Sequence, residues 1–357
     1  MAGALKILMT TDTVGGVWTY TIDLCKALEA YNVEVYLTSM GALVNKQQQL
    51  QLDTLQNVSF YESNYKLEWM QDAQYDVEKA KEWITGIYGN IKPDILHFNN
   101  FGQTAGYWSC PVVTVYHSCV QTWWKAVKGE RPPKEWDWYI ALLKDALNAS
   151  DAIIFPSNSM QQQAEAVFRS LKGDVIYNGR SLKQPPDLIK EDVILTAGRI
   201  WDEGKNIQLL CSIAPSLPWP VHVAGNNVDP NNQEIPKLEN VAFLGQLNQA
   251  EMFDAMLRAS IFIMPAKYEP FGLAVLEAAN ASCALVLADI PTLKEIWGDA
   301  ALYFDPVDKH AAAQAIVKLI KDAELRKEMA LKAQQRAKAY TAKKMAEEYY
   351  QLYQSLI

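Results

Sequence analysis

Two glutamates, Glu269 and Glu277, stand eight residues apart in the segment AKYEPFGLAVLEAANAS. Glu269 follows an apolar run, and the pattern over residues 272–279 predicts the helix that comes next. Glu277 lies two turns along that helix, where its carboxylate can accept hydrogen bonds from two vicinal ribose hydroxyls. Because such pairs are common in acidic chains, the two glutamates predict a ligand site only in combination with further residues.

The start of the same helix offers an anion-binding site. The backbone amides of Phe271, Gly272 and Leu273 would point outward from the helix N-terminus, where free N–H groups and the helix dipole favour negative charge. Gly272 has no Cβ, so a phosphate or a sugar can lie against its backbone. These residues therefore predict contact with a phosphorylated ligand.

A pair of cations stands in AGRIWDEGKN, after the first strand expected in the second half of the chain. Arg199 and Lys205 belong to a loop that also contains Gly198 and Gly204. Two fixed cations in one strand-to-helix loop can bracket a diphosphate and stabilise the charge that develops as it leaves. Alone they would be interpreted as solvated surface cations, and it is the glutamate pair that favours a site.

Two successive series of strands and helices must position these residues. Near-continuous apolar strands separated by helical patterns indicate parallel sheets covered on both faces. The fold class is therefore predicted to be α/β, with two Rossmann-like doubly wound domains facing a cleft and ligands at the carboxyl ends of the strands. Strands are expected at 6–10, 33–39, 58–61, 94–98, 111–117, 151–157 and 174–179, and then at 193–198, 220–225, 241–245, 260–266, 283–289 and 301–306.

A polar, proline-bearing stretch at 181–192 separates the two series and is interpreted as the interdomain linker. We expect an N-terminal domain over residues 1–182 and a C-terminal domain over residues 183–340. The segment 341–357 carries apolar residues at helical spacing and is expected to form a helix that packs back across the domains.

Composition excludes several classes of function. The net charge is −8 and no block of like charge occurs, so no nucleic-acid partner is expected. No apolar stretch reaches the roughly 18 residues of a membrane span, and the five scattered cysteines are typical of reduced thiols in a cytoplasmic protein. Neither paired histidines nor a D-x-D sequence occurs, so no metal and no other cofactor is expected.

Together these segments resemble glycosyltransferase family 4, a retaining family with the GT-B fold. EPFGLAVLE is similar to the family's E-x7-E motif, and GRIWDEGKN to its arginine and lysine diphosphate motif. VAFLGQLNQAEMFDAM resembles the segment that binds the nucleotide base, TVGGVWTY the glycine loop, and PVVTVYHS the strand that ends at a site histidine. The resemblance implies that the N-terminal domain binds the acceptor and the C-terminal domain binds the nucleotide sugar.

The resemblance also implies a role for each matching residue. Arg199 and Lys205 would bind the donor diphosphate, and Glu277 would bind the ribose. Glu269 would lie near the hexose hydroxyls, and His117 beside the anomeric carbon, donating to a sugar hydroxyl. His117 has a structural alternative, as a histidine that caps a buried strand end. The other donor contacts would come from Gly15, Gly16, Leu247, Phe271, Gly272 and Leu273.

The implied activity is retaining transfer of a hexose from a nucleotide-diphosphate sugar. UDP-glucose is the first candidate for the donor and GDP-mannose is the second. The acceptor would be a saccharide or a lipid-linked saccharide, in polysaccharide or glycoconjugate synthesis. The leaving phosphate would take the acceptor's proton in a front-face route, while a covalent route through Glu269 stays open. A non-catalytic nucleotide-sugar-binding protein, an epimerase and a phosphorylase are alternatives.

Acceptor contacts are expected from the first half of the chain. Trp123 and Trp124 lie in a segment rich in tryptophan and cations, which could stack on a sugar, contact a membrane surface or form a lid. His97 ends another strand and stays open between acceptor contact and core support. We expect a monomer or weak dimer in the cytoplasm, able to associate peripherally with the inner face of the membrane.

The chain departs from the family's pattern at the end of the first domain. NGRS at residues 178–181 stands where family members often have N-G-V-D, so the usual acidic residue is missing. The family's A-x-G-x-P-V stretch is replaced at residues 281–284 by ASCA. These departures bear on loop shape and donor preference but leave the charged residues of the predicted site intact.

Overall fold

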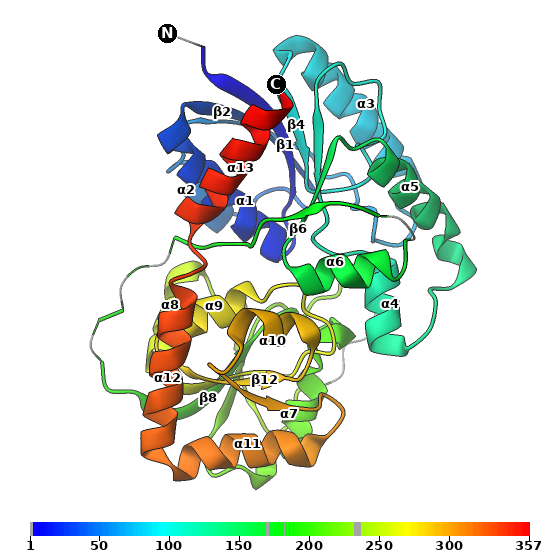
Figure 1. The fold of residues 1–357 in the computed structure, drawn as a ribbon. Helices are drawn as coiled ribbons and strands as arrows, with labels where there is room; N and C mark the ends of the chain where they lie inside the picture. Colours follow the sequence, from blue (N-terminus) through cyan, green and yellow to red (C-terminus); the bar gives the residue numbers. More distant parts are fainter. Residues whose placement is uncertain (1–2, 169–170, 182, 184, 187, 232–236) are drawn as a thin grey trace. The chain divides into compact units, whose positions relative to one another are not determined.

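The computed structural model describes residues 3–168, 171–181, 183, 185–186, 188–231 and 237–357. The chain divides into two compact units, each built on one parallel sheet with helices packed around it (Figure 1). The first unit consists of Met1–Lys125, Gly129–Gly179 and Ala342–Ile357, and the second of Ala126–Lys128 and Arg180–Thr341. The last helix of the chain is therefore part of the first unit.

The sheet of the first unit has seven strands in the order β3-β2-β1-β4-β5-β6-β7, paired in parallel. Ile7, Leu8 and Met9 of β1 are fully buried, as expected when helices cover both faces of a sheet. Every strand overlaps a range predicted from the sequence. The strands are β1 (Leu5–Asp12), β2 (Val33–Met40), β3 (Val58–Glu62), β4 (Ile95–Phe98), β5 (Val112–Val115), β6 (Ala152–Phe155) and β7 (Asp174–Val175).

The helices of the first unit include one from the end of the chain. In Figure 1 this helix, α13, lies against α1, and Tyr349 of α13 is edge-on to Tyr20 of α1 with ring centroids 6.2 Å apart. The buried Met345, Tyr349 and Tyr353 form its inner face. The helices are α1 (Gly16–Leu28), η1 (Glu29–Tyr31), α2 (Lys46–Leu52), α3 (Gln74–Ile91), α4 (Val120–Lys128), η2 (Lys134–Trp136), α5 (Asp137–Asn148), α6 (Asn158–Glu165) and α13 (Ala342–Leu356).

The sheet of the second unit has six strands in the order β10-β9-β8-β11-β12-β13, also paired in parallel. Its core is built from branched aliphatic side chains such as Ile194, Ile261 and Val286, all fully buried. These strands also overlap the predicted ranges, so the prediction of an α/β fold with two Rossmann-like sheets is confirmed. They are β8 (Glu191–Ala197), β9 (Val221–Ala224), β10 (Ala242–Gly245), β11 (Ala259–Met264), β12 (Ala284–Ala288) and β13 (Leu302–Phe304).

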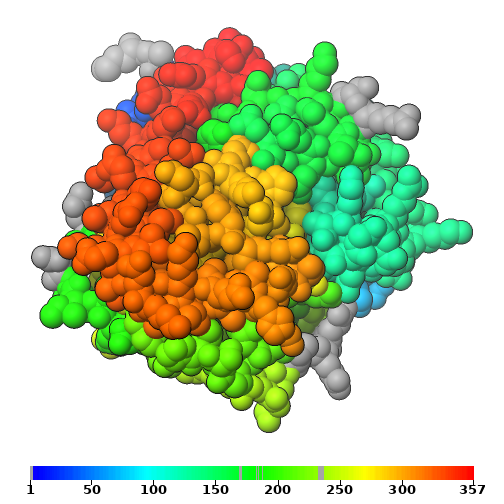
Figure 2. Space-filling view, turned by 60° about the horizontal axis from the view of Figure 1, so that its bottom comes forward, coloured from blue at the N-terminus to red at the C-terminus, as the bar shows by residue number. Residues whose placement is uncertain are grey.

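The helices of the second unit connect these strands, and α11 and α12 form part of its outer surface, shown in orange in Figure 2. Both helices place alanine and aliphatic side chains such as Ile316 and Ala333 in the interior. The helices are η3 (Glu203–Lys205), α7 (Ile207–Ile213), η4 (Ala214–Ser216), α8 (Gln249–Arg258), α9 (Leu273–Asn280), α10 (Pro291–Trp297), α11 (Lys309–Lys321) and α12 (Ala323–Ala337).

The stretch interpreted as a linker ends earlier than expected. β8 begins at Glu191, inside that stretch, because Glu191 pairs with Ala259 of β11 and extends the ladder. Residues 182, 184 and 187 of the stretch lie outside the described residues. Polar composition alone therefore placed the start of the second sheet too late.

Each sheet has a point where the strand order reverses. In the first unit β1 lies between β2 and β4, and in the second unit β8 lies between β9 and β11. Ligands of open parallel sheets bind outside the carboxyl ends of the strands at such points. The loops that follow β1, β4, β8 and β11 are therefore the places where site residues are expected. The glycine loop follows β1, and the segments with Arg199 and Glu269 follow β8 and β11, whereas His117 follows β5.

Candidate active site

Lys205 and Glu269 bring the two predicted motifs of the second unit together. Lys205 ends η3 after β8, Glu269 follows β11, and Lys205 Nζ lies 2.7 Å from Glu269 Oε2. The two side chains are only 12% and 11% exposed. The backbone supports the contact, because the amides of Lys267 and Tyr268 both donate to Gly204 O, at 2.9 and 3.3 Å. The cation loop and the glutamate loop thus form one structure at the carboxyl edge of the second sheet.

Arg199 is held in the same loop by a carboxylate. Its Nη2 donates to Asp202 Oδ2 at 2.7 Å, while Asp202 Oδ1 accepts from Gly204 N at 2.9 Å. The guanidinium carbon also lies over the Trp201 ring, 5.2 Å from its centroid. Asp202 is buried, whereas the Arg199 side chain is 36% exposed. Arg199 is therefore oriented by its neighbours and still open to a ligand.

Glu277 is paired with a cation that sequence reasoning missed. On α9 its Oε1 accepts from Arg180 Nη1, and the two form an ion pair with side chains 19% and 4% exposed. Arg180 is fixed through its backbone, since its N–H donates to Tyr340 O at 3.2 Å. The signal was present in the sequence, because Arg180 belongs to the NGRS departure, but only the missing acid was noticed there.

The start of α9 has the geometry of an uncapped helix N-terminus. Gly272 is the N-cap residue, one position before the helix, and has a φ of 92°. Gly272 has no side chain that could cap the first turn, and that turn contains no acidic residue. Phe271 is buried and packs edge-on against Tyr340, with centroids 5.6 Å apart. The first-turn amides, beginning with that of Leu273, can therefore bind an anion.

Glycine at position 272 is required by the backbone as well as by any ligand. A Cβ there would lie 3.2 Å from Val275 Cγ2 and 3.5 Å from Glu269 Cγ, and the positive φ disfavours other residues. The same distances place Gly272 beside the ion pair of Glu269.

Leu247 is a half-buried residue in the loop between β10 and α8. That loop is tied to the end of β9 by a bond from Gly225 N to Gly245 O at 2.8 Å. A Cβ on Gly225 would lie only 1.8 Å from Gly198 O, so this glycine allows the loops after β8 and β9 to approach each other. Gly225 was not singled out in the sequence, where it is one of 17 glycines without a distinguishing pattern.

His117 lies in the first unit, just after β5, and is half-buried. Its Nε2 lies 2.8 Å from Asn99 Oδ1, and the Tyr20 ring packs edge-on at 4.7 Å between centroids. Burial, with a smaller contribution from His97, lowers the pKa of His117 to about 3. The ring is therefore neutral near pH 7.

Gly15 and Gly16 lie in the same unit, between β1 and α1. Gly15 is the N-cap residue with a φ of 98° and has no side chain that could cap the helix, and both glycines are exposed. Asp12 Oδ1 accepts from Val14 N at 2.9 Å and shapes the turn that precedes them. The first amides of α1 are thus available to a ligand, as the glycine-loop motif implies.

The structure favours core support for His97. The residue is fully buried on β4, and its Nδ1 lies 2.6 Å from Tyr353 Oη of α13. Burial lowers its pKa to about 3. An imidazole enclosed in this way has no surface for an acceptor, so the expectation of direct acceptor contact is not supported.

Trp123 and Trp124 form an edge-on pair on α4, with ring centroids 5.9 Å apart. Both are half-buried, and the helix begins with a capping box between Cys119 and Thr122. Each ring has accessible surface, as stacking on a sugar requires, but the contact itself stays a prediction.

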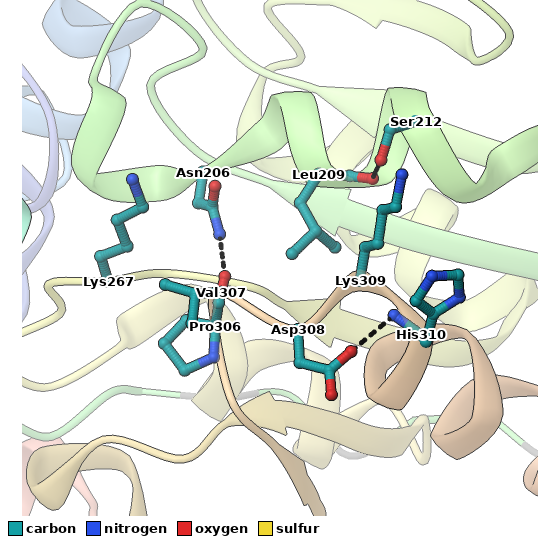
Figure 3. Close-up of a pocket in the computed structure, with 9 residues that line it drawn as sticks. All are labelled: Asn206, Leu209, Ser212, Lys267, Pro306, Val307, Asp308, Lys309 and His310. Atoms are coloured by element: carbon teal, nitrogen blue, oxygen red, sulfur yellow. Dashed lines mark hydrogen bonds between the residues drawn. The ribbon is translucent and has the colours of Figure 1, made fainter.

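A separate hollow of about 560 Å³ opens on the second unit (Figure 3). Asn206 closes one side of it, since its Nδ2 donates to Pro306 O at 2.9 Å and to Pro265 O at 3.0 Å. None of the predicted site residues lines it. Its lining residues are Asn206, Leu209, Ser212, Lys267, Pro306, Val307, Asp308, Lys309 and His310.

In the part of the chain that the structure describes, no three His, Cys, Asp or Glu side chains are grouped so that they could ligate a metal ion. Across the same residues, none of the helices combines the length and the apolar character needed to span a bilayer.

Comparison with known families divides the chain much as the two sheets do. Residues 14–184 match Glycosyltransferase Family 4, and residues 181–336 match Glycosyl transferases group 1. This chain belongs to the family 4, group 1 glycosyltransferases. The segment with Arg199, Lys205, Glu269 and Glu277 lies inside the second match, and His117 inside the first.

A curated relative and two solved structures illustrate this membership. The sulfoquinovosyl transferase of Arabidopsis thaliana is 23% identical over 292 residues, which cover 72% of this chain and 56% of the relative. The chain thus spans about half the length of that relative. Sucrose-phosphate synthase from Thermosynechococcus elongatus has a TM-score of 0.80 at 17% identity, covering 99% of both chains.

Anabaena HepE, solved in complex with UDP and glucose, has a TM-score of 0.75 at 16% identity, covering 99% of this chain and 100% of HepE. At such identities the likeness shows the fold alone. The fold of this glycosyltransferase is therefore GT-B.

Proposed function

We propose that this chain is a retaining hexosyltransferase that transfers glucose from UDP-glucose to a saccharide or lipid-linked saccharide. The observation that carries the proposal is the ion pair between Lys205 and Glu269, which joins the diphosphate motif to the start of α9. In one place it assembles a cation for the diphosphate, a carboxylate for the hexose hydroxyls and free helix amides.

The cations of this site keep donors for phosphate oxygens. Lys205 has three N–H groups and gives one of them to Glu269. Arg199 gives one Nη to Asp202 and keeps other guanidinium donors on its exposed side. Both residues can therefore bind the diphosphate and stabilise the negative charge that grows on it as the bond to the sugar breaks.

Glu277 is suited to bind the ribose. Its Oε1 accepts from Arg180, which leaves Oε2 as an acceptor for the ribose hydroxyls. Hydrogen bonds to a carboxylate are stronger than those between neutral groups.

Glucose transfer in this site would proceed on one face of the sugar. The bond from the anomeric carbon to the diphosphate oxygen breaks, the acceptor oxygen bonds to that carbon from the same face, and the leaving phosphate takes the acceptor's proton. Glu269 then binds hexose hydroxyls, a role supported by its ion pair with Lys205. A glycosyl adduct trapped on Glu269 would instead assign it the nucleophile's role.

The acceptor is proposed to contact the first unit. Trp123 and Trp124 offer half-buried rings of the kind that stack on sugars.

Nucleotide binding tests the proposal directly. UDP is the first nucleotide to test, supported by the fold that the chain shares with HepE. We expect UDP to raise the melting temperature, because a ligand that binds only the folded state at 100 times its Kd adds about 2.7 kcal/mol to stability. A rise in the melting temperature with GDP alone would indicate GDP-mannose as the donor. No rise with UDP, GDP or ADP would contradict nucleotide-sugar transfer altogether.

A further inference from the structure

A buried asparagine in the first unit has its side-chain orientation fixed by the backbone. Asn99 follows β4, and its Nδ2 donates to Thr10 O at 2.7 Å, while its own N–H donates to Thr10 Oγ1 at 2.9 Å. A carbonyl oxygen can only accept, so the nitrogen of the Asn99 amide must face Thr10. The amide oxygen consequently faces the opposite direction.

That amide oxygen meets two histidines. Asn99 Oδ1 lies 2.8 Å from His117 Nε2 and 3.3 Å from His97 Nε2. An amide oxygen has two lone pairs and no proton, so both ring nitrogens must carry hydrogen and donate to it. In a neutral imidazole with hydrogen on Nε2, Nδ1 is an acceptor.

The other side of His97 agrees with this assignment. Its Nδ1 lies 2.6 Å from Tyr353 Oη, whose hydroxyl donates to it. Tyr20 Oη, 3.4 Å from His97 Nε2, then acts as a further acceptor. His117 differs from His97, because within the described residues its Nδ1 has no hydrogen-bond partner.

We infer that Asn99 is a positioning residue, which holds His117 in the tautomer with hydrogen on Nε2 and so presents Nδ1 as an acceptor to a sugar hydroxyl. The part that concerns the sugar rests on the proposed function. It reverses the expectation from the sequence that His117 donates to that hydroxyl. A neutral acceptor adds no positive charge beside an oxocarbenium-like transition state.

The groups around His117 favour this neutral form. They are Tyr20 from α1, Asn99 after β4 and His97 from β4. Tyr349 and Tyr353 from α13 pack in turn against His97. Burial raises the pKa values of all three tyrosines, so none is an anion near pH 7. Within the described residues, no carboxylate is placed to stabilise an imidazolium at this position.

Histidine NMR tests the inference without any substrate. In the full chain labelled with 15N at histidine, long-range 1H–15N spectra at pH 7 should show His117 and His97 with hydrogen on Nε2. Asn99→Leu removes the shared acceptor, and His117 should become a mixture of tautomers. Asn57→Leu is the matched control, since Asn57 also bridges backbone carbonyls, at 3.0 and 3.1 Å, but contacts neither histidine. Hydrogen on His117 Nδ1 in the parent protein, or an unchanged tautomer in Asn99→Leu, would overturn the inference.

Kinetics then test what the tautomer does. Asn99→Leu should lower kcat/KM about tenfold, the effect of one lost hydrogen bond. Asn99→Asp keeps the acceptor but adds a charge, so it should raise the pKa of His117 and make activity fall as the pH drops through that value. The parent protein should lack this acid limb. If NMR gives the inferred tautomer while both variants keep full activity and no acid limb, the positioning role is overturned and the nucleotide-binding proposal is not.

Discussion

In the first unit, His117 is surrounded by neutral partners, whereas in the second unit each acidic residue of the candidate site is paired with a cation. Asn99, Tyr20 and His97 enclose His117, and burial keeps the ring uncharged. In contrast, Lys205 binds Glu269 and Arg180 binds Glu277. The first region therefore depends on neutral hydrogen bonds and ring contacts, and the second on ion pairs. The two regions should respond differently to substitution and to pH.

The difference follows from what each region is proposed to do. A diphosphate brings negative charge, so the second unit needs cations that are held in place before the ligand arrives. A sugar ring that develops positive charge needs acceptors, and a neutral imidazole supplies one without repulsion. Removing one member of a buried ion pair leaves an uncompensated charge, whereas removing one neutral hydrogen bond costs much less.

The largest effect is expected from breaking the Arg180 and Glu277 pair. Arg180→Met leaves the Glu277 carboxylate without its cation, with side chains that are 4% and 19% exposed in the parent protein. The free energy of unfolding should fall by about 3–5 kcal/mol, as for other buried pairs that lose one partner. Urea unfolding measures this change.

A second substitution and an exposed pair serve as controls for Arg180. Adding Glu277→Leu to Arg180→Met should recover much of the lost stability, because the unpaired charge is removed. Lys332→Met breaks an exposed pair with Glu328 and should leave the unfolding midpoint nearly unchanged. Equal effects of Arg180→Met and Lys332→Met would show that burial of the pair has no importance.

Lys205→Met should have the next largest effect, and on catalysis. Loss of the ammonium removes stabilisation from the leaving diphosphate, so kcat should fall by roughly 100-fold to 1,000-fold. Lys267→Met removes a neighbouring cation whose Nζ lies 3.9 Å from Glu203 Oε1, and it should keep kcat close to the parent value. Steady-state kinetics with varied donor separate kcat from KM. Similar kcat values for both variants would show that Lys205 does not take part in the reaction.

The contrast between the two units also explains which parts of the structure could be predicted from the sequence. The strands could be predicted because each is a local apolar run, such as Ile7 to Met9 of β1, that is buried where it stands. Lys205 and Glu269 could be assigned to one site because both of their motifs resemble those of glycosyltransferase family 4, and the structure places them after β8 and β11, which are paired strands. Local patterns are therefore sufficient for the strands, and motifs for the residues at the ends of these two strands.

The partners that orient the site could not be predicted in this way. Arg180 reaches Glu277 from a segment 97 positions away, and Asn99 is oriented by a carbonyl oxygen 89 positions away. Arg180 stands out in the sequence only as part of the NGRS departure, and nothing there indicates Glu277 as its partner. Asn99 belongs to no pattern that would indicate Thr10. His97 stayed open between two roles for the same reason, since it is fully buried and one of its partners, Tyr353 of α13, is 256 positions away.

Acid should weaken the first unit through two of its histidines. His97 and His117 have pKa values lowered to about 3 in the folded chain, whereas an unfolded imidazole titrates near about 6.5. Below that pH the unfolded chain takes up protons that the folded chain does not. The free energy of unfolding should therefore fall as the pH decreases from about 6.5 toward 3, by up to about 1.4 kcal/mol per pH unit for each histidine.

Urea unfolding between pH 7 and pH 5 measures this slope. His97→Gln should reduce the slope, because one of the two imidazoles no longer titrates on unfolding. His310→Gln, at an exposed position on α11, should leave it unchanged. A slope that is the same in His97→Gln and in the parent protein would mean that the first unit does not exclude the imidazolium.

The smallest of these effects concerns Gly272, where backbone and ligand requirements coincide. Gly272→Ala places a methyl group at a φ of 92°, 3.2 Å from Val275 Cγ2 and 3.5 Å from Glu269 Cγ. Stability should fall by about 1–2 kcal/mol because of the left-handed conformation, and the KM for the donor should rise because the methyl group crowds the anion site.

Gly298→Ala separates these two causes, since Gly298 has a φ of 52° but open space where its Cβ would be. That variant should lose stability and keep the parent donor KM. If Gly272→Ala also kept its donor KM, the start of α9 would not be in contact with the diphosphate, and the charge of the leaving group would have to be met by Arg199 and Lys205 alone.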